Sequence, residues 1–570
     1  MMTYSEKPFP RRFVAADFIP SDWAGLEPYY RTLSEAPLDT AAQLERWLRE
    51  WSELRAVADE FVTRRYIEMT CHTDDPARKE AYLYCVREVE PKLTEWDDTL
   101  NRRYYESPAR AALDPAVHAR LDRMIAVSIE LFDARNIPVQ VTLQERSQRY
   151  QEIMGAMTVH FEGQERTMPQ MAKFLREPDR ALRERAWRAA ADRRLKETDT
   201  LDALFDEMLA LRAEYAHNLG LADYREYCFK SKLRDYTADD CLRFHTAIEK
   251  TAVPLARALT EERRRAMGLD GGVAPWDADC DEKGRPPLAP FEKVERLTSG
   301  VAAIFNSVDP RFGERYAALG GLMDLDSRKG KAPGGYQATL AEAGMPFIFT
   351  NAVGSQNDVN TLLHEGGHAF HTLQCRQLPL IWYRHAPMEF SEVASMTQEL
   401  LGGERLEHFY ATPEERARAR REHLAGIVTL FPWVAQVDAF QHWLYTHPGH
   451  TREQRGGAWM ELSRRFSTGV DWTQAPEEAR RFGWQRQLHI FEVPFYYIEY
   501  AIAQLGALQI YRDYRRQPKD AVDRYLAALA LGGSKSAPEL FAAAGARFDF
   551  SEGLMAELMD LLAREIETLS

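Results

Sequence analysis

The sequence predicts an all-α protein with one small sheet, and three observations support this fold class. Residues 22–135 consist mostly of long amphipathic segments rich in Glu, Arg and Leu, such as DTAAQLERWLREWSELRAVADEF, a pattern typical of helices packed in a bundle. Helical periodicity resumes at Met168 and continues to about residue 265. Residues 157–161 and 334–354 are two short stretches with the alternation or composition of strands. We therefore expect strands to be exceptions in a helical body.

The composition argues against several classes of partner. The 570 residues carry a formal net charge of −14, whereas nucleic acids and anionic membranes both require basic surface. The most apolar segment, 424–443, is interrupted by Pro, Gln and Asp, which indicates a buried helix rather than a membrane span. The six cysteines form no C-x-x-C pair, as is typical of reduced thiols in a cytoplasm. Residues 1–14 lack the apolar core of a signal peptide, so we expect a cytoplasmic protein that binds neither nucleic acid nor membrane.

Two segments are predicted to form strands. Residues 157–161 alternate polar and apolar side chains and are followed closely by Gly163, which predicts a short strand pair. The segment GGYQATLAEAGMPFIFTNAVG (334–354) is rich in β-formers between Gly and Pro, which predicts a hairpin or small sheet. An exposed edge there could hold a peptide backbone as an added strand. A purely structural hairpin is the alternative.

The chain is organised around the stretch SQNDVNTLLHEGGHAFHTLQ (355–374). It contains the pattern H-E-x-x-H at His364, Glu365 and His368. On a helix this pattern places two imidazoles one turn apart on one face, where a single tetrahedral zinc can bind both. The glutamate between them is the usual general base of a zinc peptidase. A solvated polar helix face is the alternative interpretation.

The motif is predicted to lie on a helix that Asn357 or Asp358 caps. Its apolar positions recur at helical spacing on the side opposite the histidines. Gly366 and Gly367 each cost about 1 kcal/mol of helix propensity relative to alanine. Two glycines inside a helix indicate close packing by a substrate or by a neighbouring helix.

A third metal ligand has to come from elsewhere in the chain. The extended pattern H-E-x-x-H-x-x-G-x-x-H fails, because His371 stands where it needs Gly and Gln374 where it needs His. Three ligands from successive turns of one helix would crowd one metal, so we interpret His371 as a supporting or packing residue. Cys375 has no base partner at motif spacing, and we interpret it as packing.

A carboxylate from a following helix is the other solution. The segment APMEFSEVASMTQELL (386–401) places Glu392 and Glu399 two turns apart on one polar face. We predict that Glu392 is the third ligand. Glu399, with Glu389 as a further candidate, would orient a ligating histidine. An ordinary solvated acidic face is the alternative.

A last group of candidate residues lies at 489–500. His489 precedes Tyr496, Tyr497 and Tyr500, and the last two are three residues apart, the spacing of one helix face. Amide hydrolysis creates an oxyanion, and Tyr O–H and His N–H groups are suitable donors to it. An aromatic-rich core helix is the alternative interpretation. We favour Tyr500 and Tyr497 as donors, with His489 beside them.

These motifs carry a resemblance to a known family. HEGGHAFH followed by FSEVASMTQEL resembles the M3 zinc metallopeptidases, the group of thimet oligopeptidase and oligoendopeptidase F. The similarity extends to residues 328–365 and 489–508, and TVHFEGQERTMPQM (158–171) resembles the oligoendopeptidase F branch. In that family the glutamate of the second segment, here Glu392, is a zinc ligand. A histidine and tyrosines of the C-terminal segment contact the substrate and the transition state.

The resemblance implies two helical lobes around a deep channel that admits unstructured oligopeptides. We divide the chain into an N-terminal helical region with a strand pair (1–195) and a zinc metallopeptidase domain (196–570). One Zn²⁺ per chain would lower the pKa of a water toward about 7, and Glu365 would take its proton and pass it to the leaving amine. The expected activity is cleavage of internal peptide bonds. The alternatives are a helical zinc carboxypeptidase or dipeptidyl peptidase and an inactive peptide-binding scaffold.

Overall fold

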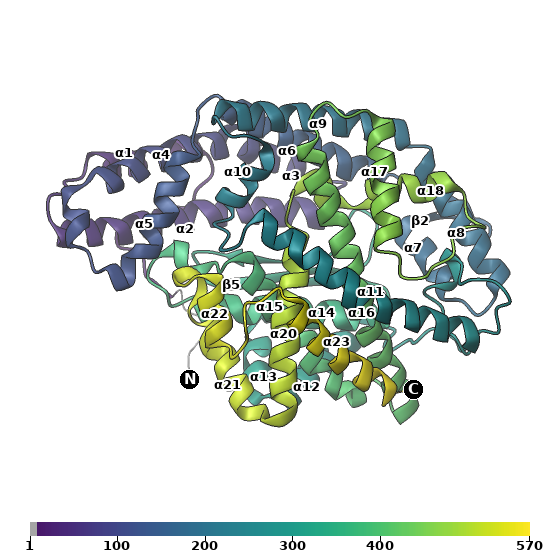
Figure 1. Ribbon diagram of the computed structural model, residues 1–570. Helices are drawn as coiled ribbons and strands as arrows, with labels where there is room; N and C mark the ends of the chain where they lie inside the picture. Colours follow the sequence, from purple (N-terminus) through teal and green to yellow (C-terminus); the bar gives the residue numbers. More distant parts are fainter. Residues whose placement is uncertain (1–7, 570) are drawn as a thin grey trace.

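Helices make up most of the chain in the computed structural model, which describes residues 8–569 (Figure 1). The first helices are α1 (Trp23–Glu35), α2 (Ala41–Cys71), α3 (Pro76–Tyr84), α4 (Glu90–Glu106), α5 (Pro115–Glu130) and α6 (Asn136–Gly155). The middle of the chain forms α7 (Met168–Lys173), α8 (Arg180–Leu195), α9 (Thr198–Asn218), α10 (Tyr224–Ser231), α11 (Ala238–Ala266), α12 (Val294–Val308) and α13 (Pro310–Ala318).

The C-terminal part contributes the remaining α-helices of the described residues. They are α14 (Gln356–Cys375), α15 (Met388–Gly402), α16 (Pro413–Thr446), α17 (Arg452–Arg465), α18 (Glu477–Arg481), α19 (Leu488–Glu492), α20 (Ile498–Arg516), α21 (Pro518–Leu529), α22 (Ala537–Ala543) and α23 (Glu552–Glu567). The predicted all-α fold class is confirmed. The first seven residues of the segment 1–14, for which we predicted no signal peptide, lie outside the described residues.

The predicted strand pair forms as β1 (Thr158–Phe161) and β2 (Gln164–Thr167). They pair antiparallel, and the turn between them places Glu162 at φ 49° and Gly163 at φ 77°. Two left-handed residues in a two-residue loop match the right-handed twist of the flanking strands. Gly163, the residue from which the strand pair was predicted, is thus one of the two residues that form its turn.

The second β segment forms β4 (Tyr336–Leu340) and β5 (Met345–Ala352), an antiparallel hairpin beside α14. A third strand, β3 (Met323–Asp326), pairs parallel with β5 and was not predicted. Its four residues, Met-Asp-Leu-Asp, are too short to show a period. Because the order is β3-β5-β4, strand β4 lies at an edge of the sheet.

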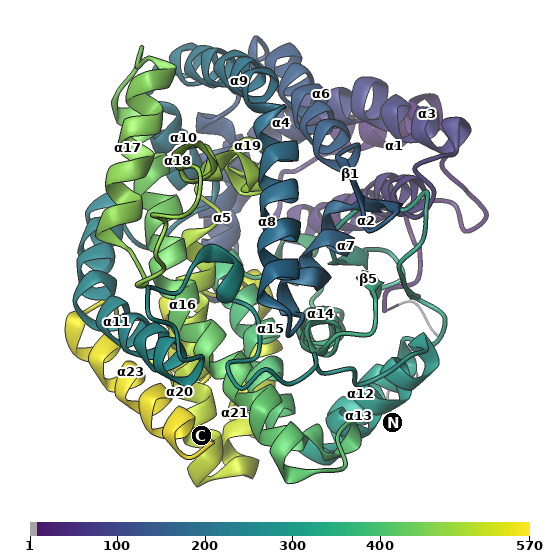
Figure 2. The ribbon, with the colours of Figure 1, turned by 90° about the vertical axis from the view of Figure 1, so that its right-hand side faces the viewer.

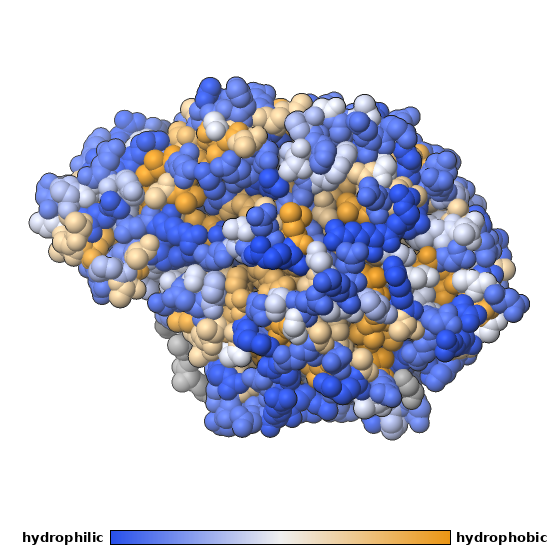
Figure 3. Space-filling view, viewed as in Figure 1, coloured by the Kyte–Doolittle hydropathy of each residue, from blue (hydrophilic) through white to orange (hydrophobic). Residues whose placement is uncertain are grey.

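The helices gather in two groups. In Figures 1 and 2 the N-terminal helices, with α9, α10 and α17, lie above α12, α13, α20 and α21. Helices α14 and α15 lie between the two groups (Figure 2). The face shown in Figure 3 is mostly hydrophilic, with smaller apolar areas scattered over it.

Helix α16 contains the predicted buried segment 424–443. Its length and composition would suit a membrane span, but 67% of its most apolar window is buried inside the protein. It is the one helix of this kind in the described part of the chain. Since α16 packs against α11, α20 and α23, its apolar character is that of a core helix.

A cavity of about 1270 Å³ is lined mainly by residues of α8, α11, α14, α15 and α16. Its wall includes Trp187 and Arg194 of α8 on one side and Asn360 of α14 and Glu399 of α15 on the other. The cavity therefore reaches both helices that carry the predicted metal ligands.

Candidate metal centre

Helix α14 carries the H-E-x-x-H motif, and its start is set by a capping box. The Ser355 side chain accepts from the backbone N–H of Asp358, and the Asp358 carboxylate accepts from the N–H of Ser355 at 2.7 Å. We predicted that Asn357 or Asp358 caps the helix start by accepting backbone N–H bonds; Asp358 does accept them, but the N-cap position itself belongs to Ser355. Ser355 caps, and Asp358 completes the box from the third helical position.

Neighbouring helices explain the two glycines of the motif. A Cβ on Gly366 would lie 2.5 Å from the Phe305 ring of α12. A Cβ on Gly367 would lie 2.5 Å from the carbonyl oxygen of Ala394 in α15. Of the two predicted causes, packing by a neighbouring helix is the one that the structure shows. The absence of side chains here lets α15 approach α14 closely enough to present its carboxylates.

His364, His368 and Glu392 converge on one point. One donor atom from each lies within 4.8 Å of the other two. Glu392 Oε2 is 3.4 Å from His364 Nε2 and 3.5 Å from His368 Nε2. Donors about 2.0–2.1 Å from a shared tetrahedral zinc stand about 3.3 Å apart. Two imidazole nitrogens and one carboxylate oxygen are a donor set that zinc accepts, so these residues fit a zinc ion.

Glu399 orients His364. Its Oε1 lies 2.7 Å from His364 Nδ1, and its Oε2 lies 3.0 Å from His423 Nε2. A carboxylate only accepts, so Nδ1 of His364 carries a proton, and Nε2 is the ring nitrogen that a metal would bind after displacing any proton there. The sequence placed Glu399 near a histidine, but it contained no sign of His423, which lies on another helix, α16.

The carboxylates and imidazoles shift one another's protonation. Burial alone lowers the pKa of His364, but Glu392 and Glu399 raise it well above its usual value. Burial raises the pKa of Glu392, but His368 and His364 hold it well below its usual value. Glu392 is therefore anionic in the folded protein, as a ligand must be.

Glu365 lies beside this cluster in a largely dry position. Its side chain is buried, and Oε2 has no hydrogen-bond partner among the described residues. Burial raises its pKa above the ordinary value. A carboxylate with a raised pKa and a free oxygen is suited to take up a proton.

Tyr496 contacts Glu392 directly, although the spacing of the aromatic residues favours its neighbours. Its hydroxyl donates to Glu392 Oε1 at 2.6 Å. Helical spacing indicates Tyr497 and Tyr500, but α20 begins at Ile498, so Tyr496 and Tyr497 precede it. Phe495, at φ 61°, turns the chain just before them. A left-handed phenylalanine has no sequence signal, and this turn decides which tyrosine faces Glu392.

His489 and Tyr500 form the other wall of the site. The Tyr500 hydroxyl lies 3.4 Å from His489 Nε2. Burial lowers the pKa of His489 to about 4 and raises the pKa of Tyr500 well above its usual value. Near neutral pH both groups are thus uncharged, and the tyrosine is an O–H donor. The Tyr497 ring centroid lies 4.8 Å from that of His489.

Three residues near the motif lie away from the cluster. Buried Glu389, a candidate to orient a histidine, faces Arg234 and Tyr236 instead. His371 is buried near the Phe390 ring, at 6.1 Å between ring centroids. The Cys375 thiol donates to the Leu529 carbonyl at 3.0 Å. His371 and Cys375 therefore occupy packed positions, as we predicted from the spacing.

The fold and the H-E-x-x-H helix define a class, the helical metallopeptidases, and comparison with known proteins identifies the family. The family model described as Peptidase family M3 matches residues 173–560, and Peptidase M3 N-terminal domain matches residues 13–132. The chain belongs to peptidase family M3.

Individual proteins show the same likeness. The solved structure of PZ peptidase A with an inhibitor superposes with a TM-score of 0.92 and 26% identity, covering 97% of this chain and 98% of that one. A protein assigned as an oligoendopeptidase F gives the same TM-score and identity over 100% and 99% of the two chains. Oligopeptidase PepF of Bacillus subtilis is 25% identical over 252 residues, 41% of this chain. That match spans just over a third, 36%, of the relative's length.

Proposed function

We propose that this chain is a zinc-dependent endopeptidase that hydrolyses internal bonds of short, unstructured oligopeptides. The observation that carries the proposal is the convergence of His364, His368 and Glu392, with donor separations of 3.4 and 3.5 Å. These three residues would hold the ion. When bound, zinc supplies Lewis acidity, which lowers the pKa of a water toward about 7 and polarises a carbonyl.

Glu365 acts as the general base. Its free Oε2 takes a proton from the attacking water, and the same carboxyl later donates that proton to the leaving amine. Tyr500 and His489 donate hydrogen bonds to the carbonyl oxygen as negative charge develops there, with Tyr497 as a further donor. Tyr496 keeps the Glu392 carboxylate in place through Oε1, and Glu399 keeps His364 in place.

Substrate binding uses the cavity and the sheet edge. The cavity of about 1270 Å³ reaches the candidate metal centre at Asn360 and Glu399, and its size suits an extended chain but not a folded domain. Strand β4 is an edge strand, and a Cβ on Gly335 just before it would lie 3.8 Å from Glu365 Oε1. A peptide added to β4 as a further strand would therefore pass the general base.

The proposal also covers the division of the chain into domains and the location of the protein in the cell. We assign residues 1–195 to an N-terminal helical region and 196–570 to the catalytic domain. The six cysteines are free and buried in the structure, which supports a reducing, cytoplasmic location.

Metal content and cleavage products, measured together, test the function. The purified protein would be analysed for metal and incubated with an internally quenched peptide blocked at both ends, with and without a chelator. Zinc together with chelator-sensitive internal cleavage is the expected result. Release of residues only from a free C-terminus would point to a carboxypeptidase, and absence of both metal and activity would overturn the proposal.

A further inference from the structure

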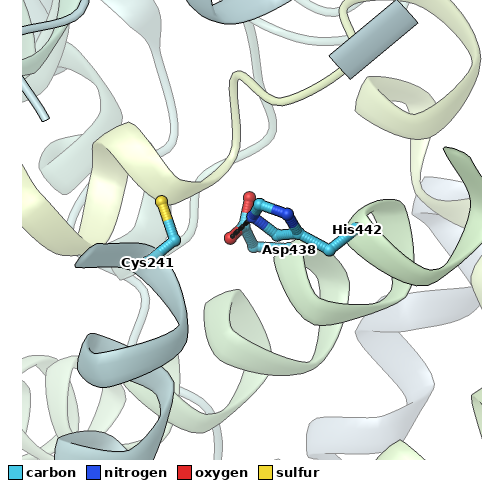
Figure 4. Close-up of side chains that lie close together, drawn as sticks. All are labelled: Cys241, Asp438 and His442. Atoms are coloured by element: carbon cyan, nitrogen blue, oxygen red, sulfur yellow. Dashed lines mark ion pairs between the residues drawn. The ribbon is translucent and has the colours of Figure 1, made fainter. Parts of the chain in front are cut away.

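A second group of potential metal ligands lies in the helical core, outside the site described above. Helix α11 presents Cys241 and His245, four residues apart, and α16 presents Asp438 and His442 at the same spacing. Residues four apart on a helix lie on one face. Two packed helices thus direct two pairs of donor side chains toward each other. Figure 4 shows three of the four, Cys241 of α11 and Asp438 and His442 of α16.

The donor atoms lie close together. One donor atom from each of Cys241, Asp438 and His442 is within 4.8 Å of the other two, and His442 Nε2 is 3.3 Å from Asp438 Oδ2. In Figure 4 the Asp438 carboxylate lies between the Cys241 thiol and the His442 ring. Thiolate, imidazole and carboxylate donors around one zinc stand about 3.3–3.8 Å apart. Small side-chain adjustments would bring all three within bonding distance of one ion.

The cluster is buried, and two of its polar atoms lack a well-formed hydrogen bond. Cys241, Asp438 and His442 are exposed by 2%, 0% and 5%. Asp438 Oδ1 has no hydrogen-bond partner among the described residues, and His442 Nε2 lies 3.3 Å from Asp438 Oδ2 without the alignment of a hydrogen bond. A buried polar atom without a hydrogen bond destabilises the folded protein. Both belong to the group that would hold the ion, so a cation would satisfy them together.

We propose that Cys241, Asp438 and His442 form a second, structural metal site that takes zinc or a similar divalent transition metal. His245 holds the carboxylate in place, since its Nε2 lies 2.9 Å from Asp438 Oδ2. A ligating carboxylate that is itself hydrogen-bonded is typical of metal sites in proteins.

The charges of this site balance. A thiolate and a carboxylate neutralise a divalent cation, so no net charge is buried. The rings of Phe229 and Phe495 pack on His442, at 6.0 and 5.1 Å between ring centroids, which keeps the surroundings apolar. Arg225 lies 3.5 Å from His442 Nδ1 and 3.6 Å from Asp223. Ligation through Nε2 leaves Nδ1 protonated, so Arg225 then pairs with Asp223.

The site is connected to the catalytic wall. Gln441, next to His442, accepts the backbone N–H of Phe495 at 2.7 Å. Phe495 has the left-handed backbone that precedes Tyr496. A metal that fixes this part of α16 would therefore stabilise the turn that presents Tyr496 to Glu392.

Cobalt substitution tests the proposal independently of activity. A thiolate bound to Co²⁺ gives a charge-transfer absorption band in the near ultraviolet, and the catalytic centre contains no sulfur ligand. We expect the Co²⁺-loaded full-length protein to show this band and to hold two metal equivalents. Cys241→Ser should lose the band and one equivalent, and His442→Ala should lose one equivalent.

Cys228→Ser is the matched control, since Cys228 is another buried helical cysteine, and it should keep the band and both equivalents. A wild-type protein with one equivalent and no thiolate band overturns the proposal. A band that persists in Cys241→Ser overturns it as well. Because the band is read first on the wild-type protein, the test remains decisive even if a variant fails to fold.

Discussion

Tyr496 donates a 2.6 Å hydrogen bond to Oε1 of Glu392. The other oxygen, Oε2, lies 3.4 Å from His364 Nε2. One carboxylate oxygen is therefore held by Tyr496, and the other faces the candidate metal ligand His364. Tyr496, together with Ser395, which donates to Oε2 at 3.0 Å, thus holds the Glu392 carboxylate in its orientation toward the histidines.

Replacing Tyr496 tests this support. Tyr496→Phe should weaken metal binding about 10-fold or more, the usual effect of removing a group that orients a ligand. Competition with a chromogenic chelator measures the affinity. Tyr497→Phe is the control and should bind metal like the wild type, since its hydroxyl lies near Trp433 and Gln487 instead. Equal affinities in all three proteins would contradict the assigned role.

Glu365→Gln separates metal binding from proton transfer. The substitution removes the base, so the cleavage rate should fall by about 10²–10⁴ or more. The metal content should stay at the wild-type value, because Glu365 is not among the three converging donors. Glu392→Ala should behave in the opposite way and lose the metal. Full activity in Glu365→Gln, or unchanged metal content in Glu392→Ala, would show that these roles are misassigned.

Glu399 should act on the metal only through His364. Glu399→Ala removes the 2.7 Å contact to Nδ1 and should lower metal affinity about 10–100-fold. Glu399→Gln should recover part of this loss, because its amide oxygen still accepts from Nδ1–H. Both affinities can be measured by the same chelator competition. An alanine variant with wild-type affinity would show that His364 needs no such partner.

Gly367 is a position where an added methyl group has no room. Gly367→Ala should destabilise the protein by about 1–3 kcal/mol or more, because the new Cβ would lie 2.5 Å from a backbone carbonyl of α15. Gly426→Ala in α16 is the control. Nothing lies within 4 Å of its Cβ, so the helix propensity of alanine should raise stability by about 0.5–1 kcal/mol. Thermal midpoints at one scan rate measure both, and a neutral Gly367→Ala would refute the close approach.

Glu492 should make stability depend on pH. Burial raises its pKa to about 7 in the folded protein, against an ordinary value of 4.5. The folded state therefore binds the proton more tightly, and this carboxyl lowers stability progressively as pH rises from about 4.5 to 7. Glu492→Gln removes the penalty and should stabilise the protein by about 1–2 kcal/mol above pH 7, a value reduced for partial solvent contact.

To check this, the free energies of unfolding of Glu492→Gln and of the wild type are compared below about pH 4.5 and above about pH 7. The gain should disappear below about pH 4.5, where the wild-type carboxyl is protonated in both states. Gln151, which donates to Glu492 at 3.0 Å, can still donate to the amide oxygen. A pH-independent difference between the two proteins would contradict this account.

The sequence by itself determined the helical fold class, the β1–β2 hairpin and the motif that names His364, Glu365 and His368. These features depend on local chemistry: helical periodicity, a glycine that allows positive φ, and a four-residue spacing. The same local logic placed Glu392 and Glu399 on one helix face.

Only the tertiary structure decided how these pieces meet. The reason for Gly367 lies in α15, the partner of Glu399 lies in α16, and the choice of Tyr496 depends on the turn at Phe495. Cys241 and Asp438 are 197 positions apart in the chain, and only the packing of α11 on α16 makes them neighbours. Contacts between distant segments depend on the packing of the whole chain, so no local sequence pattern predicts them.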